Sequence, residues 1–369
     1  TRVAATPETV KKLIALGCAL TVEAGAGMAS GLTDAAYAEA GASIAADFVK
    51  AGLDVTLIEQ WPDHVEAMNK NGLTVKMPER TEHTEVYAIH LCQVAELKTT
   101  FDLVFILVKA YDTRWAAELI KPVLSDSAIV VGLQNGMSIN DLADVLGPDR
   151  SMGAVIECCS NMFEPGVCIR ETPPEESWFG LGGLSEISHS RAEEVAEILR
   201  HAGTVQVYDD IRSAKWMKLV ANASELVTSA ILDVPLFDAV ADPKMRKFME
   251  DNAKEALAVC LAGGSRIVPI FGFTVADQEP DTYAVNLLNE VLKRFSFPDT
   301  LTTVLQDWRK GRRAEINDIN GLVVSEGLRL GIPTPANSMT LRLASEIESG
   351  VRKAEPGNLA EILEYRNGT

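Results

Sequence analysis

The stretch "TVEAGAGMASGLTDAAYAEAGASIAADFVKAGLDVTLIEQ", from Thr21 to Gln60, decides the fold. An apolar run leads into Gly25-Ala26-Gly27, a helical pattern follows, and a second apolar run, Val55 to Ile58, ends at Glu59. This order is typical of a dinucleotide-binding βαβ unit, in which Gly25 and Gly27 form the tight turn that a pyrophosphate approaches. Because Ser30 replaces the third glycine of G-x-G-x-x-G, an ordinary strand–turn–helix without a nucleotide stays open as the alternative.

The acidic residue at the end of the second strand predicts which dinucleotide is preferred. A carboxylate at this position, such as Glu59, typically binds the ribose 2′-hydroxyl of NAD and repels the 2′-phosphate of NADP. Gln60 follows it and carries no charge to neutralise that phosphate. The sequence therefore favours NADH over NADPH, and the alternative is a solvated carboxylate at a strand end.

Composition excludes several classes of function. The chain has 369 residues, enough for two domains, and is 47% hydrophobic and 23% charged, as globular proteins are. Its formal net charge of −18 argues against nucleic acid or an anionic membrane surface as a partner. The six cysteines have no C-x-x-C spacing, so free thiols of a cytoplasmic protein are expected rather than disulfides or a metal site. No apolar stretch is long enough to predict a membrane span.

The first half of the chain alternates between short apolar runs and helical patterns. Strands are expected at Thr56–Ile58, Leu103–Val108 and Ala128–Leu133, and helices at Asp63–Asn71 and Thr113–Val123. Strands that alternate with helices predict a parallel sheet.

The pattern changes twice after this alternation. The stretch from Cys168 to Gly183 predicts antiparallel strands, and it is followed by an amphipathic helix in "SRAEEVAEILRHAG" and a last strand in "TVQVY". After Ile211 the apolar residues recur at helical spacing almost throughout. We therefore predict an α/β domain over residues 1–209 and a helical domain over residues 210–369.

Several motifs outside the glycine stretch carry the functional information. "FDLVFILVKAYDT" ends a strand at Lys109, "VVGLQNGM" ends another at Asn135-Gly136, and "IRSAKWMKLVANA" places Lys218 and Asn222 four residues apart on one helix face. Together with "TLIEQWPDHVEAMNKNGLTV" and "RRAEINDINGLVV", they occur in the order and spacing of the ketopantoate reductase family. The chain resembles this family from about residue 48 to its C-terminus.

The resemblance implies a fold and an activity. The family combines a Rossmann-type domain with a helical domain, as 6-phosphogluconate dehydrogenase-like proteins do, and has its active site in the cleft between the two. It uses NAD(P)H to reduce a 2-oxo acid to a 2-hydroxy acid, as 2-dehydropantoate 2-reductase does in pantothenate biosynthesis. A cytoplasmic homodimer is also implied.

The motif match assigns roles to individual residues. Lys218 would be the general acid that protonates the keto oxygen. The other expected positions are Asn135 beside nicotinamide and substrate, Lys109 in the cofactor cleft, Thr303 and Glu315 at the substrate, and Asn222 in support of the lysine.

Physical chemistry agrees with these roles but leaves alternatives open. Hydride transfer to a carbonyl carbon develops negative charge on the oxygen, which a positioned ammonium stabilises and protonates. The alternatives are a solvated lysine for Lys218, a turn residue for Asn135 and a solvated charge for Glu315.

The sequence departs from the family pattern at two places. Leu226 and Leu236 stand where the family carries asparagines, which implies a less polar pocket and puts ketopantoate itself in doubt. Residues 1–47 are instead similar to the N-terminal module of the nicotinamide nucleotide transhydrogenase α subunit and of alanine dehydrogenase. In those proteins "VEAGAG" is not the NAD fingerprint.

Two hypotheses of different class therefore remain. In the first, the chain is a reductase whose atypical first βα unit still completes the sheet. In the second, it is a non-catalytic fusion or relic, or a regulatory binding module, whose nucleotide fingerprint has been lost.

Overall fold

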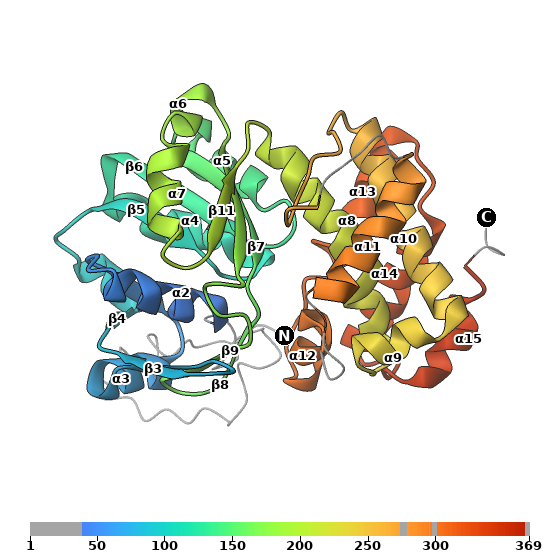
Figure 1. Cartoon of the computed structure of the whole chain (residues 1–369), viewed down its shortest axis with the longest axis horizontal. Helices are drawn as coiled ribbons and strands as arrows, with labels where there is room; N and C mark the ends of the chain where they lie inside the picture. Colours follow the sequence, from blue (N-terminus) through green and yellow to red (C-terminus); the bar gives the residue numbers. More distant parts are fainter. Residues whose placement is uncertain (1–38, 274–278, 295, 297–300, 366–369) are drawn as a thin grey trace, which may run out of the picture.

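The computed structural model describes residues 39–273, 279–294, 296 and 301–365. Figure 1 shows strands and their covering helices in one half of the molecule and helices alone in the other half, with α8 running between the two. The expected pyrophosphate glycines Gly25 and Gly27, and the helix start expected near Thr33, lie outside the described residues.

The central sheet has five strands in the order β11-β10-β7-β6-β5. Neighbours β5, β6 and β7 run parallel, whereas β10 runs antiparallel to β7 and parallel to β11. The bounds of these strands are β5 Phe101–Ile106, β6 Leu124–Leu133, β7 Ser151–Glu157, β10 Trp178–Gly183 and β11 Thr204–Val207.

Helices cover both faces of this sheet because its strand β6 is apolar on both sides. Val131 and Leu133 of β6 pack with residues of α2 (Glu39–Lys50) and α7 (Ala192–Leu199). Val130, between them, packs on the other face with α4 (Thr113–Ile120) and α5 (Ile139–Leu146). Side chains alternate in direction along a strand, so a continuous apolar run can only be buried on two sides.

Two smaller sheets complete the α/β half. Parallel β1 (Thr56–Glu59) and β4 (Tyr87–His90) form one, beside α3 (Pro62–Asn71). The other has the order β3-β2-β9-β8. Its strands are β2 Leu73–Lys76, β3 Thr81–Thr84, β8 Ser160–Glu164 and β9 Val167–Arg170.

The helical half is built around α8 (Ile211–Ala230), most of whose residues are buried. The helices that follow are α9 Leu236–Ala241, α10 Pro243–Ala262, α11 Pro280–Arg294, α12 Thr303–Arg309, α13 Asn320–Leu330, α14 Pro335–Glu348 and α15 Leu359–Ile362. In the described part of the chain, none of the helices combines the length and apolar character that a bilayer crossing needs.

The fold class expected from the sequence is confirmed: a parallel α/β part precedes an all-helical part. The antiparallel strands expected after Cys168 are found as β9 against β8 and β10 against β7. Since β11 ends at Val207 and α8 begins at Ile211, we keep the division at residue 209 as a proposal.

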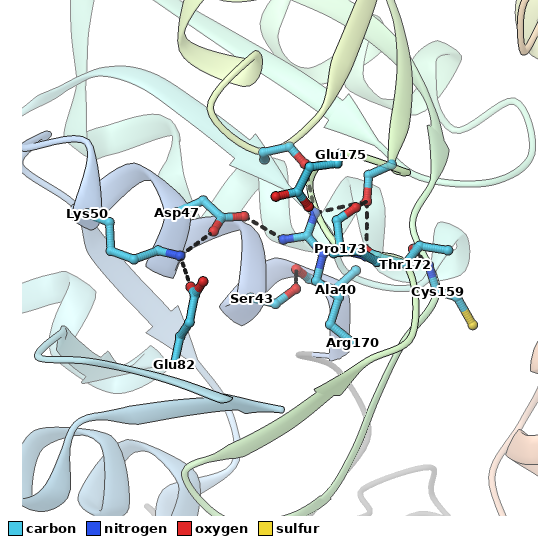
Figure 2. Close-up of polar contacts among 12 residues, drawn as sticks. Ala40, Ser43, Asp47, Lys50, Glu82, Cys159, Arg170, Thr172, Pro173 and Glu175 are labelled. Atoms are coloured by element: carbon cyan, nitrogen blue, oxygen red, sulfur yellow. Dashed lines mark hydrogen bonds and ion pairs between the residues drawn. The ribbon is translucent and has the colours of Figure 1, made fainter. Parts of the chain in front are cut away.

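A buried arginine joins the pieces of the α/β half (Figure 2). Arg170, 1% exposed at the end of β9, forms an ion pair with Asp47 of α2. Its guanidinium also donates to the carbonyl oxygen of Thr172 at 2.8 Å, to Oγ of Ser177 at 2.9 Å and to the carbonyl oxygen of Ala202 at 2.7 Å. One cation thus satisfies groups from a helix and two loops, and it fixes α2 against the sheets.

We predict that Asp47→Ala lowers the free energy of unfolding by about 3–5 kcal/mol, because it leaves the buried Arg170 charge unpaired. Lys50→Ala is the matched control, since Lys50 also pairs with Asp47 but its side chain is 37% exposed. That control should lose no more than about 1 kcal/mol. Urea unfolding of both variants measures the difference, and equal losses in the two would contradict the prediction.

Candidate active site

The carboxyl ends of three parallel strands meet at one edge of the central sheet, as parallel strands require. Lys109 follows β5, Asn135 follows β6 and Glu157 is the last residue of β7. The N-terminal half of α8 packs against this part of the sheet, because Lys215 of α8 contacts Gln134, just after β6, and Ala154, in the middle of β7.

A buried lysine fixes α8 to the sheet. Asp210 caps the helix by accepting a hydrogen bond from the backbone N–H of Ser213 at 3.1 Å. One turn on, Nζ of Lys215 donates to the carbonyl oxygen of Gln134 at 2.7 Å and to that of Ala154 at 3.0 Å. Burial lowers the pKa of Lys215 to about 7, and the nearby Glu315 carboxylate opposes this shift.

Lys218, the expected general acid, lies one turn after this anchor. It is 8% exposed and forms an ion pair with Glu157 at the end of β7. Its Nζ also lies 5.1 Å from the centre of the Phe271 ring, which packs edge-on against Trp178 with ring centres 5.1 Å apart. The ammonium is therefore held between a carboxylate and an aromatic face.

Asn135, expected beside the nicotinamide and substrate, and Asn222, expected to support Lys218, are brought together. Asn222 is 1% exposed, and its Nδ2 donates to Oδ1 of Asn135 at 3.2 Å. Gly136 next to Asn135 has φ 68°, and a Cβ there would lie 3.0 Å from the carbonyl oxygen of Asp318. Glycine is therefore required for the turn that carries Asn135 beside the helical half.

Glu225 extends the same face of α8, three residues beyond Asn222 and seven beyond Lys218. It is 4% exposed, and burial raises the pKa of its carboxyl group to about 8. The Lys218 ammonium lowers this pKa and the Glu157 carboxylate raises it, so the three groups share one electrostatic environment.

The helical half reaches the sheet edge through α12 and the segment after it. Nζ of Lys109 pairs with Asp307 of α12 at 2.7 Å, and the backbone N–H of Ala110 donates to Glu315 at 2.8 Å. Thr303 is exposed at the first residue of α12, one turn before Asp307. Lys109 and Glu315 thus lie at the junction between the two halves.

Glu59 ends β1 with a carboxylate that bonds to the backbone of its own chain. Its Oε1 accepts from the N–H of Gln60 at 2.7 Å and from that of Trp61 at 2.8 Å, which orients the start of α3. Glu59 is 6% exposed, and burial raises its pKa while the two backbone amides lower it. This carboxylate has a structural role whether or not it also binds a ribose.

Three site residues were missed in the sequence: Lys215, Glu157 and Glu225. Helical spacing could have found Glu225, because it repeats the Lys218–Asn222 face one turn later. Glu157 ends a strand at the sheet edge, which is also a recognisable signal. The sequence prediction of a less polar pocket, which is based on Leu226 and Leu236, does not consider the carboxylates of Glu157 and Glu225. Both leucines pack with the helical core.

The chain matches two models of one protein family. Residues 40–182 match the model described as "Ketopantoate reductase PanE/ApbA", and residues 210–348 match "Ketopantoate reductase PanE/ApbA C terminal". The chain is 28% identical over 308 residues to the 2-dehydropantoate 2-reductase of Archaeoglobus fulgidus, covering 82% of this chain and 92% of that protein.

Two solved structures extend the comparison. The PanE/ApbA family ketopantoate reductase from Ralstonia eutropha JMP134 superposes with a TM-score of 0.69 at 29% identity, over 83% of this chain and 94% of its own. D-mandelate dehydrogenase, solved with NADH and anilino(oxo)acetate, has a TM-score of 0.76 at 17% identity, over 86% and 98% of the two chains. The second likeness is one of fold.

We predict that Glu225 makes the stability of the chain fall as pH rises from 5 to 8. Its folded pKa of about 8 lies above the value of 4.5 of an exposed glutamate, so over this range the folded chain keeps a proton that the unfolded chain has released. Glu225→Gln removes this effect, and its free energy of unfolding relative to wild type should rise by on the order of 3 kcal/mol between pH 5 and pH 8. Urea unfolding at both pH values measures this difference, in which other titrating groups cancel. A constant difference would contradict the prediction.

Proposed function

Because the chain belongs to the ketopantoate reductase family, we propose that it reduces a 2-oxo acid to the corresponding 2-hydroxy acid, with a reduced nicotinamide dinucleotide as hydride donor. 2-Dehydropantoate is the first substrate to test, since the curated relative from Archaeoglobus fulgidus is named for its reduction. The rival hypothesis, a relic without nucleotide binding, predicts that neither NADH nor NADPH fluorescence changes on titration with the chain.

One observation carries the proposal: a buried lysine lies at the carboxyl edge of a parallel sheet, beside two asparagines. Lys218 is 8% exposed, and Asn222 on the same helix face donates to Asn135 at the end of β6. A solvated lysine would be exposed and would have no reason to sit against Glu157 and an aromatic ring. Ligands of open α/β sheets bind at this edge.

The chemistry follows from where the charges lie. The dinucleotide, when bound, supplies a hydride to the keto carbon of the substrate. As negative charge develops on the keto oxygen, the Lys218 ammonium stabilises it and donates the proton. Glu157 holds that ammonium at the sheet edge, and the amide of Asn135 is positioned to orient the groups that react.

The described residues at this edge, together with Glu59 at the end of β1 in the separate β1–β4 sheet, offer groups that suit a dinucleotide. Glu59, Lys109 and Asn135 follow or end strands β1, β5 and β6 and supply a carboxylate, an ammonium and an amide. These groups suit a ribose hydroxyl, a phosphate and a nicotinamide carboxamide in turn. Glu59 with Gln60 beside it supports a preference for NADH, and Thr303 and Glu315 would complete the substrate side.

We also propose that the enzyme is a cytoplasmic homodimer, as its family membership implies. Light scattering during size-exclusion chromatography measures the mass directly. A monomer of 39.9 kDa at micromolar concentration would contradict the dimer.

We predict that Lys218→Ala lowers kcat/KM for the 2-oxo acid by roughly 10²- to 10⁴-fold, the usual effect of losing a general acid. The dissociation constant of NADH should change by less than about threefold, because the ammonium acts on the substrate oxygen. Lys254→Ala is the control, since Lys254 is a half-buried lysine of α10 in the helical half. Turnover within about threefold of wild type in Lys218→Ala would exclude this lysine as the acid.

We predict that the wild-type chain prefers NADH to NADPH and that Glu59 causes this preference. Glu59→Gln keeps an acceptor oxygen for the N–H groups of Gln60 and Trp61 but removes the charge that repels a 2′-phosphate. The ratio of kcat/KM for NADPH to that for NADH should rise by about 10- to 100-fold, and further in Glu59→Arg. Tighter binding of NADPH than of NADH by the wild type would show that this interpretation is wrong.

A further inference from the structure

A tight turn between α10 and α11 carries a bulky residue in a conformation that such residues rarely adopt. The backbone N–H of Phe273 donates to the carbonyl oxygen of Ile270 at 2.8 Å. The two residues between them both have positive φ, 58° at Phe271 and 68° at Gly272, as in a type I′ turn. Glycine, asparagine and aspartate suit the first of these positions, whereas phenylalanine is strained there. Strain of this kind persists where the surroundings enforce it, and such places cluster at functional sites.

Side chains from both halves of the molecule brace this turn. Nη1 of Arg294, the last residue of α11, donates to the carbonyl oxygen of Phe271 at 2.7 Å. From the α/β half, the hydroxyl group of Tyr208, which follows β11, donates to the carbonyl oxygen of Pro269 at 2.6 Å. These contacts hold the strained backbone in place and fix the direction of the Phe271 side chain.

The braced turn brings an aromatic ring of the helical half against the proposed acid. Phe271 is 4% exposed, and the centre of its ring lies 5.1 Å from Nζ of Lys218 and 5.1 Å from the ring centre of Trp178 in β10. A keto oxygen that accepts a hydrogen bond from Lys218 brings the substituents of the keto carbon within reach of this ring. The side chain of a 2-oxo acid suits the ring better than its carboxylate does, because the carboxylate would lose hydration there.

The same two rings also line a hollow of about 570 Å³. Trp178, Thr204, Gln206, Phe271 and Arg294 are among the residues around it. Of the described residues that line the hollow, none is Lys218 or Glu157. Because Phe271 contacts Lys218 and also lines the hollow, its ring closes the reaction site on this side.

We propose that Phe271 determines the substrate specificity of the chain by limiting the size of the side chain that a 2-oxo acid can carry. This inference rests on the proposed reduction of a 2-oxo acid and adds a specificity-determining residue to it. Short side chains fit between Lys218 and the ring, and a side chain that ends in an aryl group is rejected. Removal of the ring joins the site to the hollow, where Trp178 offers an aromatic wall to the longer side chain.

The test uses two 2-oxo acids that differ by one phenyl group: 2-oxobutanoate and 2-oxo-4-phenylbutanoate. The full-length wild-type chain should reduce 2-oxobutanoate with a kcat/KM at least about tenfold higher. Phe271→Gly should bring the two values to within about threefold, through a gain with the phenyl compound. Glycine adopts the positive φ at this position without strain, so this variant loses the ring but keeps the turn. Phe271→Tyr keeps the ring and should retain the wild-type ratio.

Phe273→Ala is the matched control. It removes an aromatic ring from the same turn, but this ring packs on Tyr283, with ring centres 5.7 Å apart. The control should retain the wild-type ratio. Thermal unfolding checks that each variant is folded, and the ratio of two substrates on one preparation is independent of the active fraction. Phe271→Asn, whose short side chain also tolerates positive φ, gives a second measurement of the same effect.

The possible results separate the inference from the proposed function. Equal kcat/KM for both compounds in the wild type would overturn the size limit. An unchanged ratio in Phe271→Gly and Phe271→Asn, or the same change in Phe273→Ala, would overturn the role of Phe271. Turnover of neither compound, nor of 2-dehydropantoate or other 2-oxo acids, would instead overturn the proposed function and the inference with it.

Discussion

The geometry of the candidate active site depends on one buried lysine. Nζ of Lys215 bridges the carbonyl oxygens of Gln134 and Ala154, and so joins α8 to two neighbouring strands, β6 and β7. The regular geometry of α8 fixes Lys218 and Asn222 relative to Lys215 on the preceding turn. This contact therefore sets how far both residues lie from Asn135. Lowering the lysine pKa to about 7 is the consequence of burying a charge there. The helix and the sheet edge are thereby held in register without a covalent link.

A second junction brings the far end of the helical half to the same edge. Lys109 pairs with Asp307, and Glu315 accepts from the N–H of Ala110, so both residues that the family assigns to the cleft are bonded to the opposite half. These contacts draw the two halves together around the sheet edge. A phosphate near Lys109 would compete with Asp307 for the same ammonium, since a lysine is a point charge that pairs with either anion. A phosphate bound there would therefore weaken one of the contacts that join the two halves.

The sequence predicts the scaffold better than the pocket, for physical reasons. Apolar runs such as Ala128–Leu133 report burial on both faces of a strand, and the spacing of Lys218 and Asn222 reports a shared helix face, so both are local signals. The Lys215 contacts and the Lys218–Glu157 pair join residues about 60 to 80 positions apart, and only the folded chain brings them together. Glu59 shows that a predictable position does not reveal the contacts of its side chain. The pattern predicted its place at a strand end, but the amides that occupy one of its oxygens follow from the turn after it.

The carboxylates around Lys218 explain how a leucine-substituted pocket remains polar. Leu226 packs into the helical core, whereas its neighbour Glu225 lies near Lys218. Adjacent residues of a helix point to different faces, so an apolar residue at position 226 does not make the face beside Lys218 apolar. Two ionised carboxylates beside one ammonium would give the pocket a net negative charge and repel a 2-oxo acid. Burial of Glu225 avoids this because the raised pKa keeps it neutral near pH 7, while Glu157 alone balances Lys218. A neutral acid next to a neutralised ion pair therefore adds no net negative charge that would repel the anionic substrate of the proposed reaction.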